Sequence, residues 1–168
     1  MRHRKRLSIV STLEVIATTG ERATITTMND DHATAVLGSL YALAAAVIND
    51  DADAVVLLAT ELTPAQRLDL PEAAVAVAAS CISNTSDGAD PFSDPDMASV
   101  HPSLRRAIDV VLTGEHPGPI TFGVGDDVIQ ASVRAVAQTW LWMTGGDAAN
   151  AAAIARQHCA RLVRYRER

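Results

Sequence analysis

Aromatic side chains, cysteine and lysine are all scarce in this chain of 168 residues. Aromatic residues make up only 4% of it, there are two cysteines, and Lys5 is the single lysine against thirteen arginines. Cys81 and Cys159 lie 78 positions apart without CxxC spacing, which argues against a cysteine-based metal motif and favours free thiols in a reducing compartment. The pattern gives no support for a disulfide.

Long hydrophobic runs are missing as well. The longest, residues 35–48, has about 14 residues, fewer than the roughly 20 that a membrane-spanning helix requires. The basic start of the chain precedes an apolar stretch, as in a signal peptide, but Glu14 interrupts that stretch and no Ala-x-Ala-like cleavage site closes it. The sequence therefore predicts a cytoplasmic protein with no membrane segment.

What the chain has in excess is alanine, with 30 residues. Because the aromatic share is low, the core must be assembled from small side chains and a modest set of Leu, Val and Ile. Small side chains favour close helix packing. A chain of this length can bury an ordinary core without metals or disulfides, so one domain is expected.

The two signs of charge are segregated along the sequence. Residues 1–6 and 156–168 together carry a net charge of +8, whereas residues 7–155 carry −14. One interpretation is that both basic ends bind nucleic acid, because clustered arginine makes strong phosphate contacts. The other, which we favour, is that the C-terminal arginines interact with a helix dipole and the N-terminal arm lies on the protein's own acidic surface. The residues concerned are Arg2, Arg4, Lys5, Arg6, Arg161, Arg164 and Arg168.

Hydrophobic periodicity predicts helices over most of the chain. The expected helices cover about 29–48, 53–62, 71–83, 104–112, 126–144 and a last one that starts at Asp147. The first has a stripe of bulky apolar residues, and the last is expected to bury an apolar stripe that includes Val163 and to expose Arg161, Arg164 and Arg168 on the opposite side. Their expected caps are Asn29, Asp30 or Asp31, a capping box at 63–66, a restart of the chain at 70–72 and Ser103, while Gly114 and the glycines at 145–146 end helices. Residues 7–28 are read either as two short strands around a turn or as a frayed first helix.

These elements predict a mainly α fold, a compact alanine-rich helical bundle of about six helices with a short N-terminal β-hairpin as one reading of residues 7–28. The domain organisation expected is a basic arm over residues 1–6 and a single helical domain over 7–168. A polar, proline-interrupted loop at 84–102 is unusually long for a compact domain, and long loops are often functional.

No residue pattern commits the chain to catalysis, to a metal or to a cofactor. The run Asp30-Asp31-His32 is expected as a helix cap, and the aspartates of the long loop (Asp87, Asp90, Asp94 and Asp96) lack the calcium-loop spacing. The run Gly123-Val124-Gly125 falls short of a phosphate-binding loop, and two aspartates follow it. An enzyme is therefore the third hypothesis, and it would need a pocket that unites residues such as His101, His116 and the loop acids.

A binding surface is the better candidate. Trp142 falls on the side of its helix opposite the main apolar stripe, and such tryptophans often anchor interfaces, although a helix packed on both sides would also explain it. Gly38 and Ala42 lie on a small-residue face that would allow close helix approach. The sequence thus predicts a non-enzymatic, self-associating protein that binds itself or another protein. The alternative is an accessory protein that binds nucleic acid through its basic ends.

Overall fold

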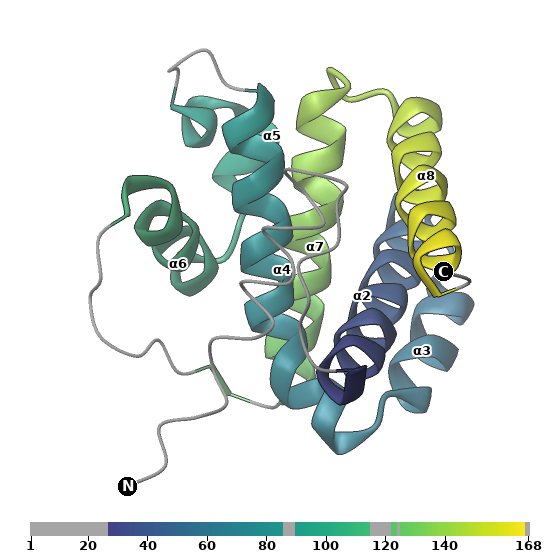
Figure 1. Ribbon diagram of the computed structural model, residues 1–168. Helices are drawn as coiled ribbons and strands as arrows, with labels where there is room; N and C mark the ends of the chain where they lie inside the picture. Colours follow the sequence, from purple (N-terminus) through teal and green to yellow (C-terminus); the bar gives the residue numbers. More distant parts are fainter. Residues whose placement is uncertain (1–26, 86–89, 115–121, 124, 167–168) are drawn as a thin grey trace, which may run out of the picture.

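In the computed structural model the described residues are 27–85, 90–114, 122–123 and 125–166, and they form seven α-helices, one 3₁₀ turn and no strand (Figure 1). The elements are α2 (Thr27–Ile48), α3 (Ala52–Glu61), α4 (Pro64–Thr85), η1 (Pro91–Ser93), α5 (Pro95–Ala98), α6 (Pro102–Thr113), α7 (Asp126–Met143) and α8 (Ala148–Arg166). The prediction of a mainly α fold is confirmed. The predicted N-terminal hairpin lies outside the described residues.

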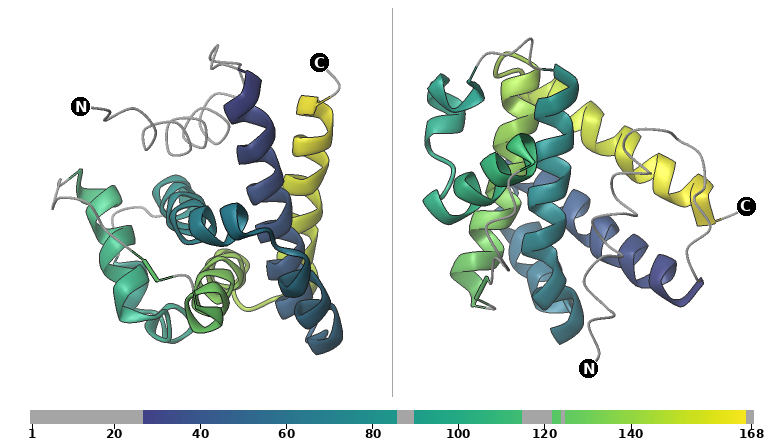
Figure 2. Two further views of the ribbon diagram at one scale, coloured as in Figure 1. Left: turned by 90° about the horizontal axis from the view of Figure 1, so that it is seen from below. Right: turned by 60° about the vertical axis from the view of Figure 1, so that its left-hand side comes forward.

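Helices α2, α4 and α7 pack against one another at the centre of the molecule. Helix α8 packs on α2 and α7, α3 packs on α2, and α6 packs on α4, so that α6 and α8 lie at opposite sides in every view (Figures 1 and 2). Two clusters of buried side chains result. The first joins α2, α4, α7 and α8, and the second joins α4, α6 and α7 with η1 and α5.

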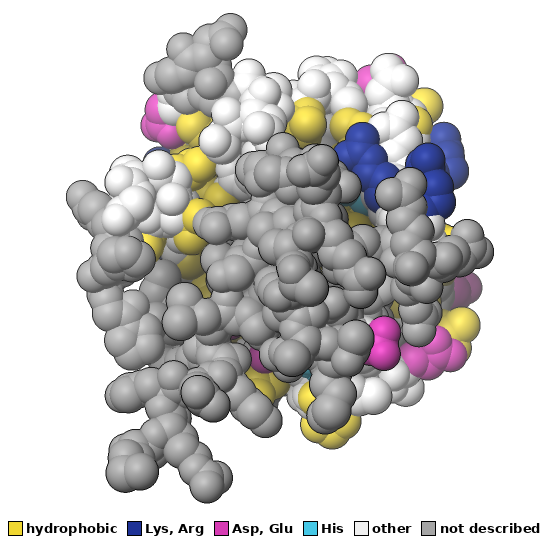
Figure 3. Space-filling view, viewed as in Figure 1, with side chains coloured by type: hydrophobic (Ala, Val, Ile, Leu, Met, Phe, Trp, Pro, Cys, Tyr) yellow, Lys and Arg dark blue, Asp and Glu magenta, His cyan; other side chains and the backbone are white. Residues whose placement is uncertain are grey.

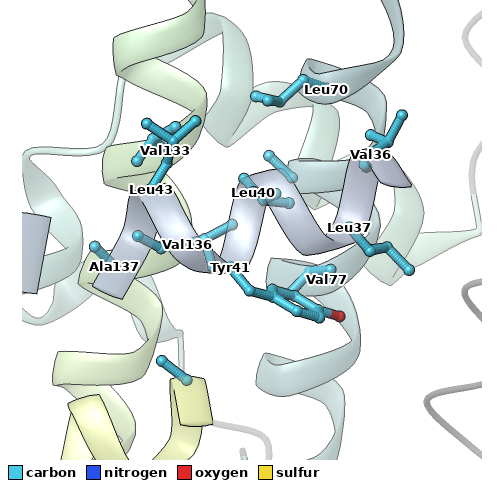
Figure 4. Close-up of a cluster of buried hydrophobic side chains, with 14 of the residues drawn as sticks. Val36, Leu37, Leu40, Tyr41, Leu43, Leu70, Val77, Val133, Val136 and Ala137 are labelled. Atoms are coloured by element: carbon cyan, nitrogen blue, oxygen red, sulfur yellow. The ribbon is translucent and has the colours of Figure 1, made fainter. Parts of the chain in front are cut away.

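The first cluster is built on the bulky stripe of α2 that the sequence predicts. Its side chains face Leu70 and Val77 of α4 and Val133, Val136 and Ala137 of α7 (Figure 4). The α2 residues concerned are Val36, Leu37, Leu40, Tyr41 and Leu43. Because four helices, α3, α4, α7 and α8, pack against α2, most of its circumference is apolar.

The same apolarity gives α2 the length and composition of a membrane-spanning helix over Asp31–Ile48. The apolar run of residues 35–48 is shorter because it leaves out residues 31–34 at the start of this window. Half of that window is buried inside the protein, and this burial in the bundle accounts for the composition of α2.

Helix α4 is continuous through Pro71, whereas the sequence predicts a new helix there. A proline inside a helix removes one backbone hydrogen bond and crowds the preceding turn. The residues from Leu70 to Ala79 are nevertheless buried on nearly all sides, between the two clusters. Burial of this segment therefore outweighs the local cost, and five alanines over 73–79 let neighbouring helices approach closely.

Several predicted helix ends are confirmed by their hydrogen bonds. Thr63 and Gln66 form the reciprocal capping box, with Gln66 N donating to Thr63 Oγ1 at 3.2 Å and Thr63 N donating to Gln66 Oε1 at 2.9 Å. Asp147 Oδ1 accepts from Asn150 N at 3.0 Å at the start of α8. Gly114 ends α6 with φ 69°, in the left-handed region that favours glycine.

Two expected caps are wrong. Helix α2 begins at Thr27, so residues 29–31 lie inside its first turns instead of capping it. At α6 the cap is His101, whose Nδ1 accepts from Ser103 N at 3.3 Å, and Pro102 takes the first helical position. Proline is favoured there because its missing N–H would have no partner in the helix.

The second half of the predicted loop at 84–102 is packed instead of open. Phe92 in η1, Met97 in α5 and Val100 after α5 are buried in the second cluster. Asp90 Oδ1 accepts from Phe92 N at 3.0 Å, and Asp94 Oδ1 accepts from Asp96 N at 2.9 Å. These aspartates therefore serve as caps of short helical turns.

Candidate functional site

The structure places the three predicted interface residues on two helices, Trp142 on α7 and both Gly38 and Ala42 on α2. Trp142 is half-buried and packs against the second cluster, which includes no residue of α2 among those described. Gly38 and Ala42 are half-buried on α2, and a Cβ added to Gly38 would have no atom within 4 Å. Helix α7 is thus packed on both sides, with Trp140 in the first cluster and Trp142 against the second.

The largest group of aromatic rings lies where α2, α7 and α8 meet. The rings of Trp140 and His158 stack with centroids 5.5 Å apart and planes at 14°, and Tyr41 lies 5.7 Å from Trp140 and 5.1 Å from His158. Burial, and then the nearby charge of Arg161, lowers the pKa of His158 from 6.5 to about 4. The imidazole is therefore neutral at pH 7, which suits a stacked core position.

A cavity of about 250 Å³ opens beside these rings, between α4 and α8, and is lined by Tyr41, Cys81, His158 and Arg161 among others. Burial raises the pKa of the Cys81 thiol to about 11, and interaction with the Trp140 indole acts in the opposite direction. Burial also raises the pKa of Cys159 and of Tyr41. Because a protonated thiol is a weak nucleophile, burial keeps Cys81 in its less reactive form.

Helix α3 carries the two most exposed large hydrophobic side chains in the described part of the chain. None of its residues is buried, and Val56 and Leu57 are 67% and 61% exposed. The outward residues of this helix, which we call the α3 face, are Asp53, Val56, Leu57, Thr60 and Glu61. The inward residues, 54, 55, 58 and 59, are only half-buried against α2. The sequence analysis missed this face, although four branched aliphatic residues in succession within a ten-residue helix could have indicated it.

The packing beneath α3 is loose. A cavity of about 280 Å³ lies between α2, α3 and α7, and its lining includes Val55, Val56 and Val133, with Asp51 and Arg134 also contributing. Helix α3 is held at its start by its cap, with Ala54 N donating to Asp51 Oδ1 at 3.0 Å. At its end the Arg67 side chain donates to the Ala59 carbonyl at 2.8 Å.

Helix α8 exposes a basic surface on its outer side. Its outward residues, which we call the α8 face, are Arg156, Ala160, Val163 and Arg164, with Arg161 beside them. The sequence placed Val163 in the core, but it is 56% exposed because α8 is packed on one side only. Arg161 and Arg164 are exposed as predicted, whereas Arg168 and the basic residues at 2–6 lie outside the described residues.

Acidic and basic side chains gather at separate places on one face of the molecule. Figure 3 shows arginine over α8 and acidic side chains over α3 below it, with hydrophobic atoms near both. Within the described segments neither the α3 face nor the α8 face contains a residue that forms an ion pair with another side chain. Both surfaces are therefore open to a charged partner.

Residues that the sequence suggested for a metal site or a phosphate site have structural roles where the structure describes them. No group of three or more His, Cys, Asp or Glu side chains there could hold a metal ion. His32 Nε2 lies 2.7 Å from Asp69 Oδ2 and so links α2 to α4. Gly125 precedes α7, and the Asp127 carboxylate would lie only 2.5 Å from a Cβ at that position, where it would repel a phosphate.

Comparison with protein families, with curated proteins and with solved structures found no match to this protein.

Proposed function

We propose that this protein is a non-enzymatic helical interaction protein that self-associates, and that the α3 face is its principal contact surface. The observation that supports this is a helix of four consecutive branched aliphatic residues in which no residue is buried. Exposed apolar patches of this kind are typical of protein–protein contacts. Burying a leucine or valine side chain stabilises an assembly by about 2 kcal/mol, so two such residues at the centre of a contact are a substantial contribution.

The test is the molar mass in solution over a wide range of protein concentration, measured by light scattering. We expect a dimer or larger assembly that Leu57→Asp converts to monomer, because the new carboxylate would have to be buried. Val111→Asp is the matched control: Val111 is 41% exposed on α6, on the other side of the molecule, and its replacement should leave the mass unchanged. A wild-type protein that stays monomeric at every concentration contradicts the proposal.

Trp142, Gly38 and Ala42 remain the interface residues predicted from the sequence, and Trp142→Ala tests the first of them in the same assay. Trp142 packs against its own molecule, so the replacement should lower the free energy of unfolding. If Trp142→Ala abolishes association and Leu57→Asp does not, the contact surface lies on α7 and not on α3.

Nucleic-acid binding is the second candidate function. The exposed arginines of α8, Arg156, Arg161 and Arg164, favour it. It requires affinity for DNA or RNA that falls steeply with salt and falls again when these arginines are neutralised. No binding at low salt would exclude it. Against it stands the strongly acidic body of the protein.

A further inference from the structure

We propose that the α3 face binds the α8 face of a second copy of this protein, and that the two contacts form reciprocally in a closed dimer. This inference rests on the proposed self-association, and it names the surface that covers α3. Four observations carry it: the charge of each face, the spacing of the charges, the size of the side chains between them, and the position of both faces on one side of the molecule.

The charges of the α3 face oppose its pairing with another α3 face. Asp53 and Glu61 stand at its two ends and are exposed, with Val56 and Leu57 between them. In an antiparallel pair Asp53 would face Glu61 of the other helix, and in a parallel pair each acid would face its own equivalent. Like charges brought together at a desolvated contact are unfavourable in either direction. The occupant must therefore be apolar at its centre and basic at its ends.

The α8 face has this pattern with the same spacing. Arg156 and Arg164 are eight positions apart, as are Asp53 and Glu61, and this separation is about 12 Å along a helix axis in both cases. Opposite charges therefore meet at both ends whether the two helices run parallel or antiparallel. Arginine can bind each carboxylate through two parallel hydrogen bonds, which adds geometric specificity.

The side chains between the charges also fit. Ala160 and Val163 are exposed in the middle of the α8 face, and Val163 lies outside the first cluster. The small side chain of Ala160 leaves room between neighbouring turns for a larger residue of the facing helix, such as Leu57. Val56 and Val163 then complete an apolar centre shielded by the two charged ends.

A single contact between two helices of this length is small compared with stable protein interfaces. Both faces belong to helices that flank α2, and Figure 3 shows their charges on one side of the molecule, basic over α8 and acidic over α3. A two-fold axis that lies in the plane between the two copies, perpendicular to the line from the α8 face to the α3 face, places each basic region over the acidic region of the other copy. Two equivalent contacts then form at once, and the assembly closes as a dimer instead of growing into a filament.

The experiment uses charge reversal in the full-length protein, with mass measured by light scattering. The α3 variant carries Asp53→Arg and Glu61→Arg, and the α8 variant carries Arg156→Glu and Arg164→Glu. Each variant alone should dimerise at least about ten-fold more weakly than wild type, because both of its contacts become like-charged. An equimolar mixture of the α3 variant and the α8 variant should restore a dimer containing one copy of each. Both faces of the α3 variant are basic and both faces of the α8 variant are acidic, so opposite charges meet at each of the two contacts. A protein with all four changes should form a homodimer.

The restored mixture shows that neither variant has simply failed to fold. If wild type is a dimer that Leu57→Asp dissociates while the α8 variant dimerises as tightly as wild type, α8 is not the occupant, and the inference fails while the proposed function stands. Failure of the two variants to form the mixed dimer also overturns it. If wild type is monomeric at every concentration, the proposed function fails and this inference fails with it.

Discussion

Replacing His158 with phenylalanine should flatten the dependence of the protein's stability on pH. The His158 ring stacks on Trp140, and burial together with Arg161 lowers its pKa from 6.5 to about 4. Between these two pH values the unfolded protein binds a proton that the folded protein excludes. The free energy of unfolding therefore carries no penalty from this group well above pH 6.5, and it falls as the pH drops towards 4.

The fall in the pKa of His158 from 6.5 to about 4 corresponds to a loss of about 3 kcal/mol in the free energy of unfolding at low pH. About 2 kcal/mol of this loss occurs between pH 7 and pH 5. Urea unfolding at these two pH values measures it. His158→Phe keeps a ring in the stack but binds no proton, so it should lose about 2 kcal/mol less than wild type on going to pH 5. Gln157→Ala, an exposed change in the same turn that removes no titrating group, should behave as wild type. An equal loss in wild type and His158→Phe would refute the reasoning.

Four further substitutions test the packing and the helix ends by urea unfolding at pH 7. Trp140→Ala should destabilise the protein by about 4 kcal/mol, since this fully buried ring joins α2, α7 and α8; a loss near zero would contradict its central place. Gly114→Ala should cost about 1 kcal/mol because of its positive φ, while Gly38→Ala, inside α2 with open space around it, should stabilise by about 0.5 kcal/mol; equal effects would contradict the backbone argument. Thr63→Ala should cost about 1 kcal/mol through loss of the capping box, and an unchanged midpoint would speak against that box.

The helices that could be predicted from the sequence are those whose boundaries depend on near neighbours. The helix expected over 126–144 is found as Asp126–Met143, because the apolar period of α7 and the glycines after it act within a few residues. The capping box at Thr63 is equally local. By contrast, Pro71 is typical of a helix start when read locally, and only the burial of α4 from both sides keeps the helix continuous.

The candidate site could not be predicted in the same way, because exposure depends on which helices lie next to one another. Val56 belongs to a run that would be buried if a second helix covered it, and Val163 belongs to a stripe that the sequence assigned to the core. Both are exposed because α3 and α8 are outer helices that pack on the bundle from one side. Trp142 shows the reverse case: its position on the helix predicts an exposed side chain, but the second cluster packs against it.

The positions of small and large apolar side chains indicate which of them serve packing and which are free to contact a partner. Alanine fills much of the centre of this protein, as at positions 73, 74 and 78 of α4, while the larger Val56 and Leu57 lie at its surface. Stability alone would favour the opposite distribution, because apolar area stabilises a fold only where water is removed from it. Small residues at the centre allow the helices to approach closely, and exposed aliphatic residues between two acids gain their apolar contacts only from a partner. The alanines at the centre are thus packed with buried leucines such as Leu37 and Leu40, while Val56, Leu57 and Val163 stay exposed and available for a partner.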